Sequence, residues 1–126
     1  MLYHGSEKRF DVLKRHQARG PSGTPAGESL NTIYFTPDFA FAFVTAAGPE
    51  GVNEVNHDEK TVRFENPRKF NPEKEVYIYV VDPSMIPNEK KILIDPWQVA
   101  VDLDEIIPAK VETHKAGEIS QYYSII

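Results

Sequence analysis

The sequence predicts an α+β fold, in which many short strands surround one central helix and at most one further, early helix. β-Branched and aromatic residues gather in short runs separated by Pro, Gly and Asn, a pattern typical of short strands joined by turns. One stretch alone, residues 39–47, combines an Ala-rich composition with a helix start signal. The 126 residues suffice for one hydrophobic core and contain no linker-like segment, so we expect a single domain over residues 1–126.

The N-terminal quarter is expected to hold two strands separated by a long connection. Residues 2–4 begin a buried strand, and residues 7–19 form a short helix or an extended arm. Residues 20–31 are rich in Gly, Pro and Ser and predict a surface loop, which we expect to face the substrate. Residues 32–36, Thr-Ile-Tyr-Phe-Thr, have the propensity of a strand.

The stretch at residues 39–47 is predicted to be a buried helix. Its Phe-Ala alternation would also fit a strand, but the residues just before it are typical of the start of a helix. Thr36 is a suitable N-cap, and Pro37 suits the first turn. Because the stretch is apolar nearly all round, we expect most of this helix to be buried.

The remainder of the chain predicts further short strands. The clearest is Val-Tyr-Ile-Tyr-Val-Val at residues 76–81, which Asp82-Pro83 ends. Others are expected at residues 61–64, 91–94, 99–103, 109–112 and 121–126, with turn-rich connections at 48–58 and 66–74.

Charge and composition narrow the classes of function. The net charge is −5, which argues against a general binder of nucleic acid or membrane surfaces. The chain has no Cys and its four His lack metal-ligand spacing, so we expect neither disulfides nor a metal site. No apolar run is long enough to span a bilayer, and no signal peptide is recognisable. A cytoplasmic protein is therefore expected, while delivery into another cell by a signal-less route stays open.

The residues that indicate chemistry lie at the end of the first expected strand. His4, Gly5 and Ser6 place an imidazole, a bare backbone and a hydroxyl on three successive residues. Glycine lets a ligand lie directly against the main chain, and His and Ser can each form directed hydrogen bonds. The same residues could simply form a strand that runs into a turn, with Ser6 as a cap.

Two stretches together resemble a known enzyme family. Leu2-Tyr3-His4-Gly5-Ser6 resembles the His-Gly-Ser strand of the diphtheria-toxin-like ADP-ribosyltransferases, which include the poly(ADP-ribose) polymerases and the small rifampin ADP-ribosyltransferases. Ile33-Tyr34-Phe35-Thr36 and the Ala-rich stretch that follows resemble the second motif of that family, at a similar spacing. The resemblance covers residues 2–6 and 32–47, and residues 75–82 loosely as a third strand. It implies a split β-sheet core with one or two helices.

The resemblance also implies roles for individual residues. His4 would hydrogen-bond the ribose of NAD, and the Gly5 backbone would clamp the nicotinamide carboxamide. Ser6 would support that clamp, Tyr34 would stack on the nicotinamide ring, and Phe35 would border the cofactor. We therefore expect His4, Gly5, Ser6 and Tyr34 to line one cleft. NAD would be a substrate, with no metal involved.

The family adds a late acidic residue close to the ribose, and this sequence offers several candidates. Glu118 precedes the last β-prone segment and is the first choice, with His4 and Tyr34 as its catalytic partners. Asp95 or Gln98 could take its place if residues 99–112 supply the last strands. Glu75, at the start of the clearest strand, is a further candidate.

Three functions remain after these observations. The first is an ADP-ribosyltransferase that moves ADP-ribose from NAD to an unidentified acceptor (protein, nucleic acid or small molecule) and releases nicotinamide. The second is an inactive nucleotide-binding or interaction module on the same fold. The third is RNA 2′-phosphotransfer, against which the acidic net charge and the His-Gly-Ser motif both argue. The oligomeric state is not predicted.

Overall fold

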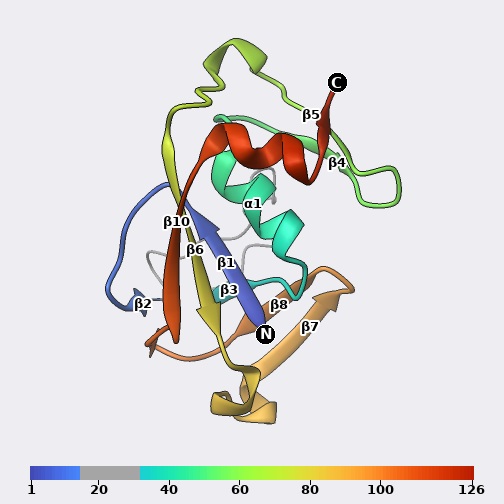
Figure 1. The fold of residues 1–126 in the computed structure, drawn as a ribbon. Coiled ribbons are helices and arrows are strands. Elements are labelled where there is room, and N and C mark those ends of the chain that lie inside the picture. The colour runs from blue at the N-terminus through green and yellow to red at the C-terminus, as the bar shows by residue number, and fades with distance from the viewer. Residues whose placement is uncertain (15–31) are drawn as a thin grey trace.

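A computed structural model describes residues 1–14 and 32–126 of the chain. The predicted loop at 20–31 and residues 15–19 of the predicted helix or arm lie outside the described residues. Residues 7–14 of that segment form no helix and end in a short strand, as expected of an extended arm. Within them the fold is α+β, as predicted: several small, mainly antiparallel sheets accompany one substantial helix and short 3-10 helices (Figure 1).

The central sheet has the strand order β1-β6-β10 and is antiparallel throughout. Its middle strand, β6 (Glu75–Val81), is the strand that the sequence predicts most clearly, and its last four residues are all buried. β1 (Leu2–Ser6) and β10 (Lys110–Lys115) flank it. The central position of β6 explains its nearly continuous apolar sequence, because both of its faces are covered.

A second sheet has the order β3-β8-β7 and meets the first at a single point. Its strands are β3 (Ile33–Phe35), β8 (Gln98–Val101) and β7 (Lys91–Asp95). The two sheets are joined by one isolated bridge, in which Tyr3 and Thr36 exchange both backbone hydrogen bonds at 2.8 and 2.9 Å. Beyond this bridge β1 and β3 separate.

The one α-helix among the described residues, α1 (Phe39–Ala47), follows the second motif as predicted, and six of its nine residues are buried. The predicted N-cap was wrong: the Asp38 side chain caps the helix by accepting from the Ala40 N–H at 3.0 Å. Thr36 Oγ1 instead accepts from the Asp38 N–H at 3.1 Å. Thr36 cannot reach the first turn because its backbone is bonded to Tyr3 in the bridge.

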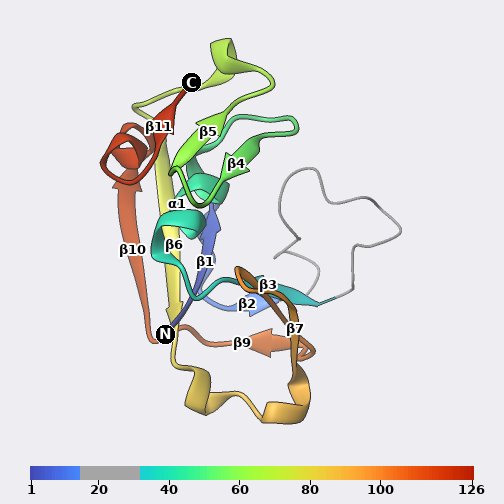
Figure 2. The ribbon, with the colours of Figure 1, turned by 90° about the vertical axis from the view of Figure 1, so that its right-hand side faces the viewer.

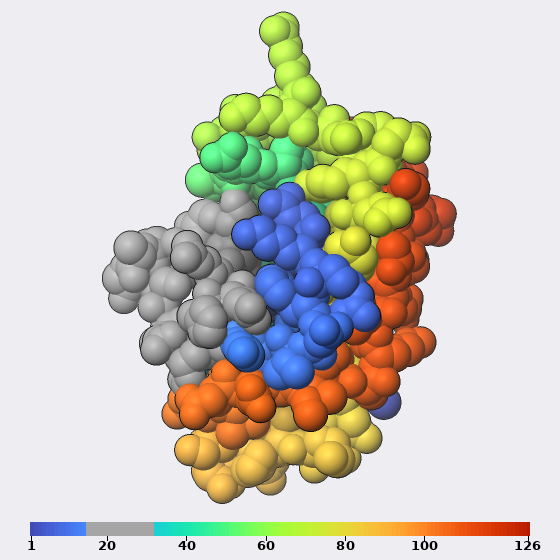
Figure 3. Space-filling model, turned by 90° about the vertical axis from the view of Figure 1, so that its left-hand side faces the viewer, coloured from blue at the N-terminus to red at the C-terminus, as the bar shows by residue number. Residues whose placement is uncertain are grey.

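The smaller elements complete the fold. β4 (Glu54–Asn56) and β5 (Thr61–Arg63) form a hairpin within a stretch partly predicted as loop, and β11 (Ser124–Ile125) adds to it in parallel. β2 (Leu13–Lys14) pairs with β9 (Glu105–Ile106), and the blue N-terminal segment lies against orange later residues in Figure 3. The 3-10 helices are η1 (Pro67–Lys69), η2 (Pro83–Met85), η3 (Asn88–Lys90) and η4 (Ala116–Gln121).

The predicted terminal strand at 121–126 was largely wrong. Only Ser124 and Ile125 are extended, because η4 continues through Gln121. In η4 the buried Ala116 and Ile119 pack into the same core as α1, and burial of these residues outweighs the β propensity of the following segment.

Two clusters of apolar side chains form the interior. One gathers α1, β5, η4 and one face of β6, and the other gathers residues of β1, β3 and β8 with the opposite face of β6. Figure 2 shows α1 on one side of β1 and β6, with β3, β7 and β9 below it. No helix in the described part of the chain is long and apolar enough to span a membrane.

Candidate functional site

His4 is buried and held in one orientation. Its side chain is 8% exposed, and Nδ1 donates to the Tyr34 carbonyl oxygen at 2.7 Å. Because a carbonyl only accepts, this bond fixes the tautomer and leaves a lone pair on Nε2. Burial lowers the pKa of His4 below 6.5, against a smaller opposite effect of this hydrogen bond. His4 is therefore a neutral imidazole near pH 7.

Gly5 allows β1 to approach helix α1 closely. A Cβ at this position would lie 2.0 Å from the Ala42 carbonyl oxygen and 2.9 Å from Thr45 Oγ1, so only glycine fits. This packing explains the glycine without reference to any ligand.

The main-chain N–H and C=O of Gly5 point away from β6, toward the second sheet. The Tyr3 N–H and C=O point to Thr36 and thus away from β6. Backbone groups two residues apart on a strand point the same way, so the Gly5 N–H and C=O also face away from β6. No described residue hydrogen-bonds them, since the contact between β1 and β3 ends at Tyr3. A donor and an acceptor therefore lie side by side on this edge.

Tyr34 meets His4 through its main chain. Its neighbours Ile33 and Phe35 point into the second apolar cluster, so the Tyr34 ring points to the opposite side of β3. The Phe35 ring lies 6.0 Å from the His4 ring, centroid to centroid. Extending the antiparallel register from the Tyr3–Thr36 bridge sets Tyr34 across from Gly5. The Tyr34 ring and Gly5 thus share one side, while His4 and Phe35 share the other. The expectation that the side chains of His4 and Tyr34 line one cleft was therefore wrong, because the register of β1 and β3 turns the two rings to opposite sides.

Ser6 has a local role in the structure. Its Oγ accepts from the Lys8 N–H at 3.0 Å, which shapes the turn after β1. It is half-buried at the end of β1, next to Gly5.

Asp95 and Gln98 form a compact polar turn between β7 and β8. Asp95 Oδ1 accepts from the Trp97 N–H at 2.8 Å, and Asp95 Oδ2 accepts from Gln98 Nε2 at 2.8 Å. Gln98 alternates with Val99 and Val101, which point into the second cluster, so its side chain lies on the same side of the sheet as the Tyr34 ring.

The structure does not bring Glu118 near His4. The carboxylate of Glu118 accepts from the Lys115 N–H at 2.6 Å and bonds His114 Nδ1 at 3.3 Å. His4 and β10 are separated by β6, which sets them about 10 Å apart. Val111 of β10 and His4 of β1 both pair with Tyr79 of β6. His114 lies three residues further along β10, so its distance from His4 grows by about 10 Å along the strand direction. Glu118 acts here as the cap of η4.

Glu75 is also remote from His4. It lies at the exposed start of β6, four residues before Tyr79, the residue that pairs with His4. It accepts from the Tyr77 hydroxyl at 3.3 Å.

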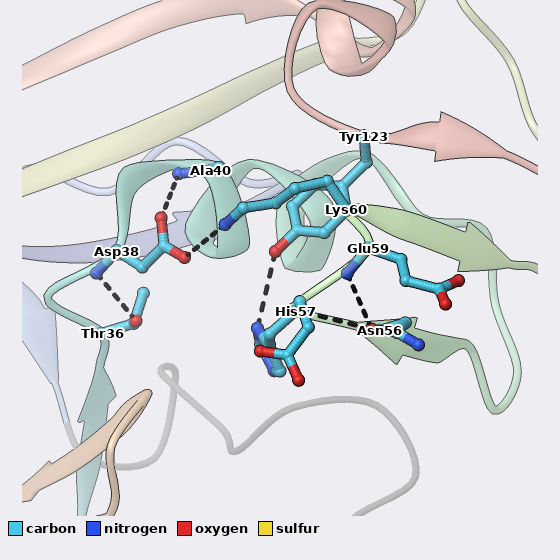
Figure 4. A network of polar contacts seen from close by, with 9 residues as sticks. Thr36, Asp38, Ala40, Asn56, His57, Glu59, Lys60 and Tyr123 are labelled. Carbon is cyan, nitrogen blue, oxygen red and sulfur yellow. Dashed lines mark hydrogen bonds and ion pairs between the residues drawn. The ribbon is translucent and has the colours of Figure 1, made fainter.

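The sequence did not predict a cluster of side chains that forms around His57. The His57 ring stacks on Trp97 at 4.0 Å, and Figure 4 shows His57 beside Tyr123, Lys60 and Asp38. These residues come from four separate segments and form no sequence motif, so the sequence shows only an isolated His and the single Trp. Among the described residues no group of His, Asp or Glu has the arrangement of a metal site.

Comparisons with known proteins give no independent assignment. No protein-family model, no curated protein and no solved structure matches this chain.

Proposed function

We propose that this protein is an NAD-dependent ADP-ribosyltransferase, which transfers ADP-ribose from NAD to an acceptor and releases nicotinamide. The observation that carries the proposal is the half-buried donor and acceptor pair of Gly5, which no described residue bonds, beside a neutral His4 that is fixed by Tyr34. The primary amide of nicotinamide presents one acceptor and one donor on a single edge, which is the complement of such a pair. The single bridge between the two sheets agrees with the split sheet that the resemblance implies.

The remaining roles follow from the side on which each group lies. The Tyr34 ring shares a side with Gly5 and would stack on the nicotinamide held there. His4 would bond a ribose hydroxyl through Nε2, the ring nitrogen that the bond to the Tyr34 carbonyl leaves as an acceptor. Phe35 and Ser6 would support this arrangement from neighbouring positions, Phe35 against the His4 ring and Ser6 through the turn after Gly5.

Of the late residues left open by the sequence, the geometry favours the pair Asp95–Gln98. Gln98 lies on the side of the Tyr34 ring, and Asp95 would supply negative charge through their shared hydrogen bond. As nicotinamide leaves, positive charge develops at C1′ of the ribose, and a nearby preorganised negative group stabilises it. Glu118 is already bonded to Lys115 and His114, so we assign it to the stability of η4.

A binding module without catalysis is the second candidate. The observation that favours it is that neither Glu118 nor Glu75 lies within reach of His4, so a directly placed glutamate is lacking among the described residues. Such a module would bind NAD through Gly5 and Tyr34 and leave it intact.

Incubation with NAD labelled in the nicotinamide ring tests both candidates. The proposal expects labelled nicotinamide to be released, and expects Gln98→Ala and Asp95→Asn to slow the release by about 10²-fold, the usual cost of losing one electrostatic partner. Glu118→Gln is the matched control and should keep near-normal turnover. Binding of NAD without any release supports the binding module. Loss of activity in Glu118→Gln alone would return the catalytic role to Glu118.

A further inference from the structure

Three separate segments hold the His57 ring. It stacks on Trp97 of the β7–β8 turn with centroids 4.0 Å apart and planes 13° apart. The Phe41 ring from α1 packs edge-on with its centroid 4.8 Å from that of His57, and the Tyr123 hydroxyl from the C-terminal segment lies 3.5 Å from Nδ1. His57 itself belongs to the β4–β5 turn. A half-buried imidazole fixed from three directions is preorganised, whereas a histidine on a surface turn normally is not.

The charges around His57 suit proton uptake. Burial lowers the pKa of His57 below 6.5, so the ring is neutral near pH 7. Asp38 acts in the opposite direction and raises the pKa, as do Asp95 and Asp58, and these carboxylates would stabilise the imidazolium once formed. Lys60 lowers the pKa, but its ammonium lies 3.6 Å from Asp38 and is partly neutralised there (Figure 4).

Tyr123 can set the tautomer of His57. Burial, aided by Asp38, raises the pKa of Tyr123 to about 12, so the phenol keeps its proton. Its oxygen can accept from Nδ1–H of His57, which would leave the Nε2 lone pair available. No described residue forms a hydrogen bond with Nε2.

His57 contacts both segments that border the proposed NAD site. Phe41 directly precedes Ala42, whose carbonyl packs against Gly5. Trp97 directly precedes Gln98, which lies on the side of the Tyr34 ring. His57 therefore contacts the direct sequence neighbours of two residues that border the proposed site, Ala42 and Gln98.

We propose that His57 is the general base for the acceptor, and that the acceptor nucleophile is a hydroxyl group. This inference rests on the proposed transferase function. In the step, the acceptor oxygen forms a bond to C1′ of the ribose while the bond from C1′ to the nicotinamide nitrogen breaks. The electron pair of that bond neutralises the pyridinium ring, and the hydroxyl proton moves to Nε2 of His57. A carboxylate acceptor carries no proton and would need no such base.

Methanol is a suitable probe, because it is the smallest hydroxyl acceptor and its product, methyl ADP-ribose, separates from ADP-ribose. The variant His57→Phe keeps an aromatic ring on Trp97 but cannot accept a proton, and His57→Ala removes both properties. Total nicotinamide release, methyl ADP-ribose formation and thermal unfolding are measured for each protein from pH 5 to pH 8.

The expected result is a loss of methyl ADP-ribose formation by about 10²-fold in His57→Phe, with a melting temperature close to that of the parent. In the parent this rate should fall as the pH drops below 6.5, because His57 becomes protonated, and His57→Phe should lack that limb. His57→Ala should lose the same activity and also unfold at a lower temperature.

Other outcomes separate the two proposals. If the parent and His57→Phe transfer ADP-ribose to methanol equally at every pH, the role of His57 as a base is overturned and the transferase function stands. The stack of His57 on Trp97 would then serve only to join the β4–β5 hairpin to the second sheet. Transfer to agmatine that depends on His57, with none to methanol, would overturn the hydroxyl assignment. A parent protein that releases no nicotinamide would refute the transferase function itself, and this inference with it.

Discussion

The contact between β1 and α1 at Gly5 predicts a large loss of stability in Gly5→Ala. The new Cβ would lie 2.0 Å from the Ala42 carbonyl oxygen, and ordinary contact begins at 3.4 Å, so strand and helix must separate by about 1.4 Å. Both groups belong to the main chain of regular elements, so neither can rotate away. A gap of this size removes a large part of the dispersion contacts along the helix.

The expected magnitude follows from this displacement. Overpacked cores cost about 1–3 kcal/mol, and a main-chain clash of this depth should reach at least the upper value. For a domain of this length, about 3 kcal/mol lowers the melting temperature by roughly 10 °C. Differential scanning calorimetry of the parent and Gly5→Ala measures this directly.

Two further variants sharpen the test. Gly117→Ala is a matched control, because its Cβ would meet the Pro72 Cβ at 3.0 Å, a much milder contact, and its effect should be much smaller. Adding Thr45→Ala to Gly5→Ala should not restore stability, since the Ala42 carbonyl remains in place. Gly5→Ala with an unchanged melting temperature would refute the close approach of β1 to α1.

Three other predictions concern pH, NAD binding and catalysis. Burial lowers the pKa of His114, but the hydrogen bonds that its ring donates to the Glu112 and Glu118 carboxylates outweigh burial and raise the pKa above 6.5. This contribution to stability is present below pH 6.5 and is lost as the pH rises through the raised pKa. His114→Gln should therefore lower the melting temperature at pH 6 more than at pH 9, and an equal loss at both would contradict the charged state. NAD at a hundred times its dissociation constant should stabilise the protein by about 2.7 kcal/mol, a shift of several degrees in a thermal melt, and the absence of a shift at millimolar NAD would count against a nucleotide site. Tyr34→Ala should weaken NAD binding about as much as it lowers kcat/KM, because stacking on nicotinamide acts in the ground state too, and a loss in kcat alone would place Tyr34 elsewhere.

The sequence by itself determined the local elements. The apolar run of β6 and the Ala-rich stretch of α1 have strong intrinsic preferences that act over a few residues, and both form where predicted. The sequence also predicted that the His4 and Tyr34 side chains line one cleft, but the His4 ring contacts the main chain of Tyr34 and not its ring. The register of the strands sets the Tyr34 carbonyl against His4 and turns the Tyr34 ring to the other side of β3. Register does not follow from residue types alone, so the sequence could not show this.

Only the tertiary structure decided which distant groups meet. Glu118 has the residue type and sequence position expected of the catalytic acid. It follows β10, however, and β10 is the edge strand that β6 separates from β1. There the Glu118 carboxylate caps η4. His57 and Trp97 are forty residues apart and carry no shared pattern, and their rings stack because the β4–β5 hairpin and the β7–β8 turn both pack near α1. Local preferences act within a segment, whereas contacts between segments arise from sheet pairing and burial summed over the whole chain, so a single sequence does not display them.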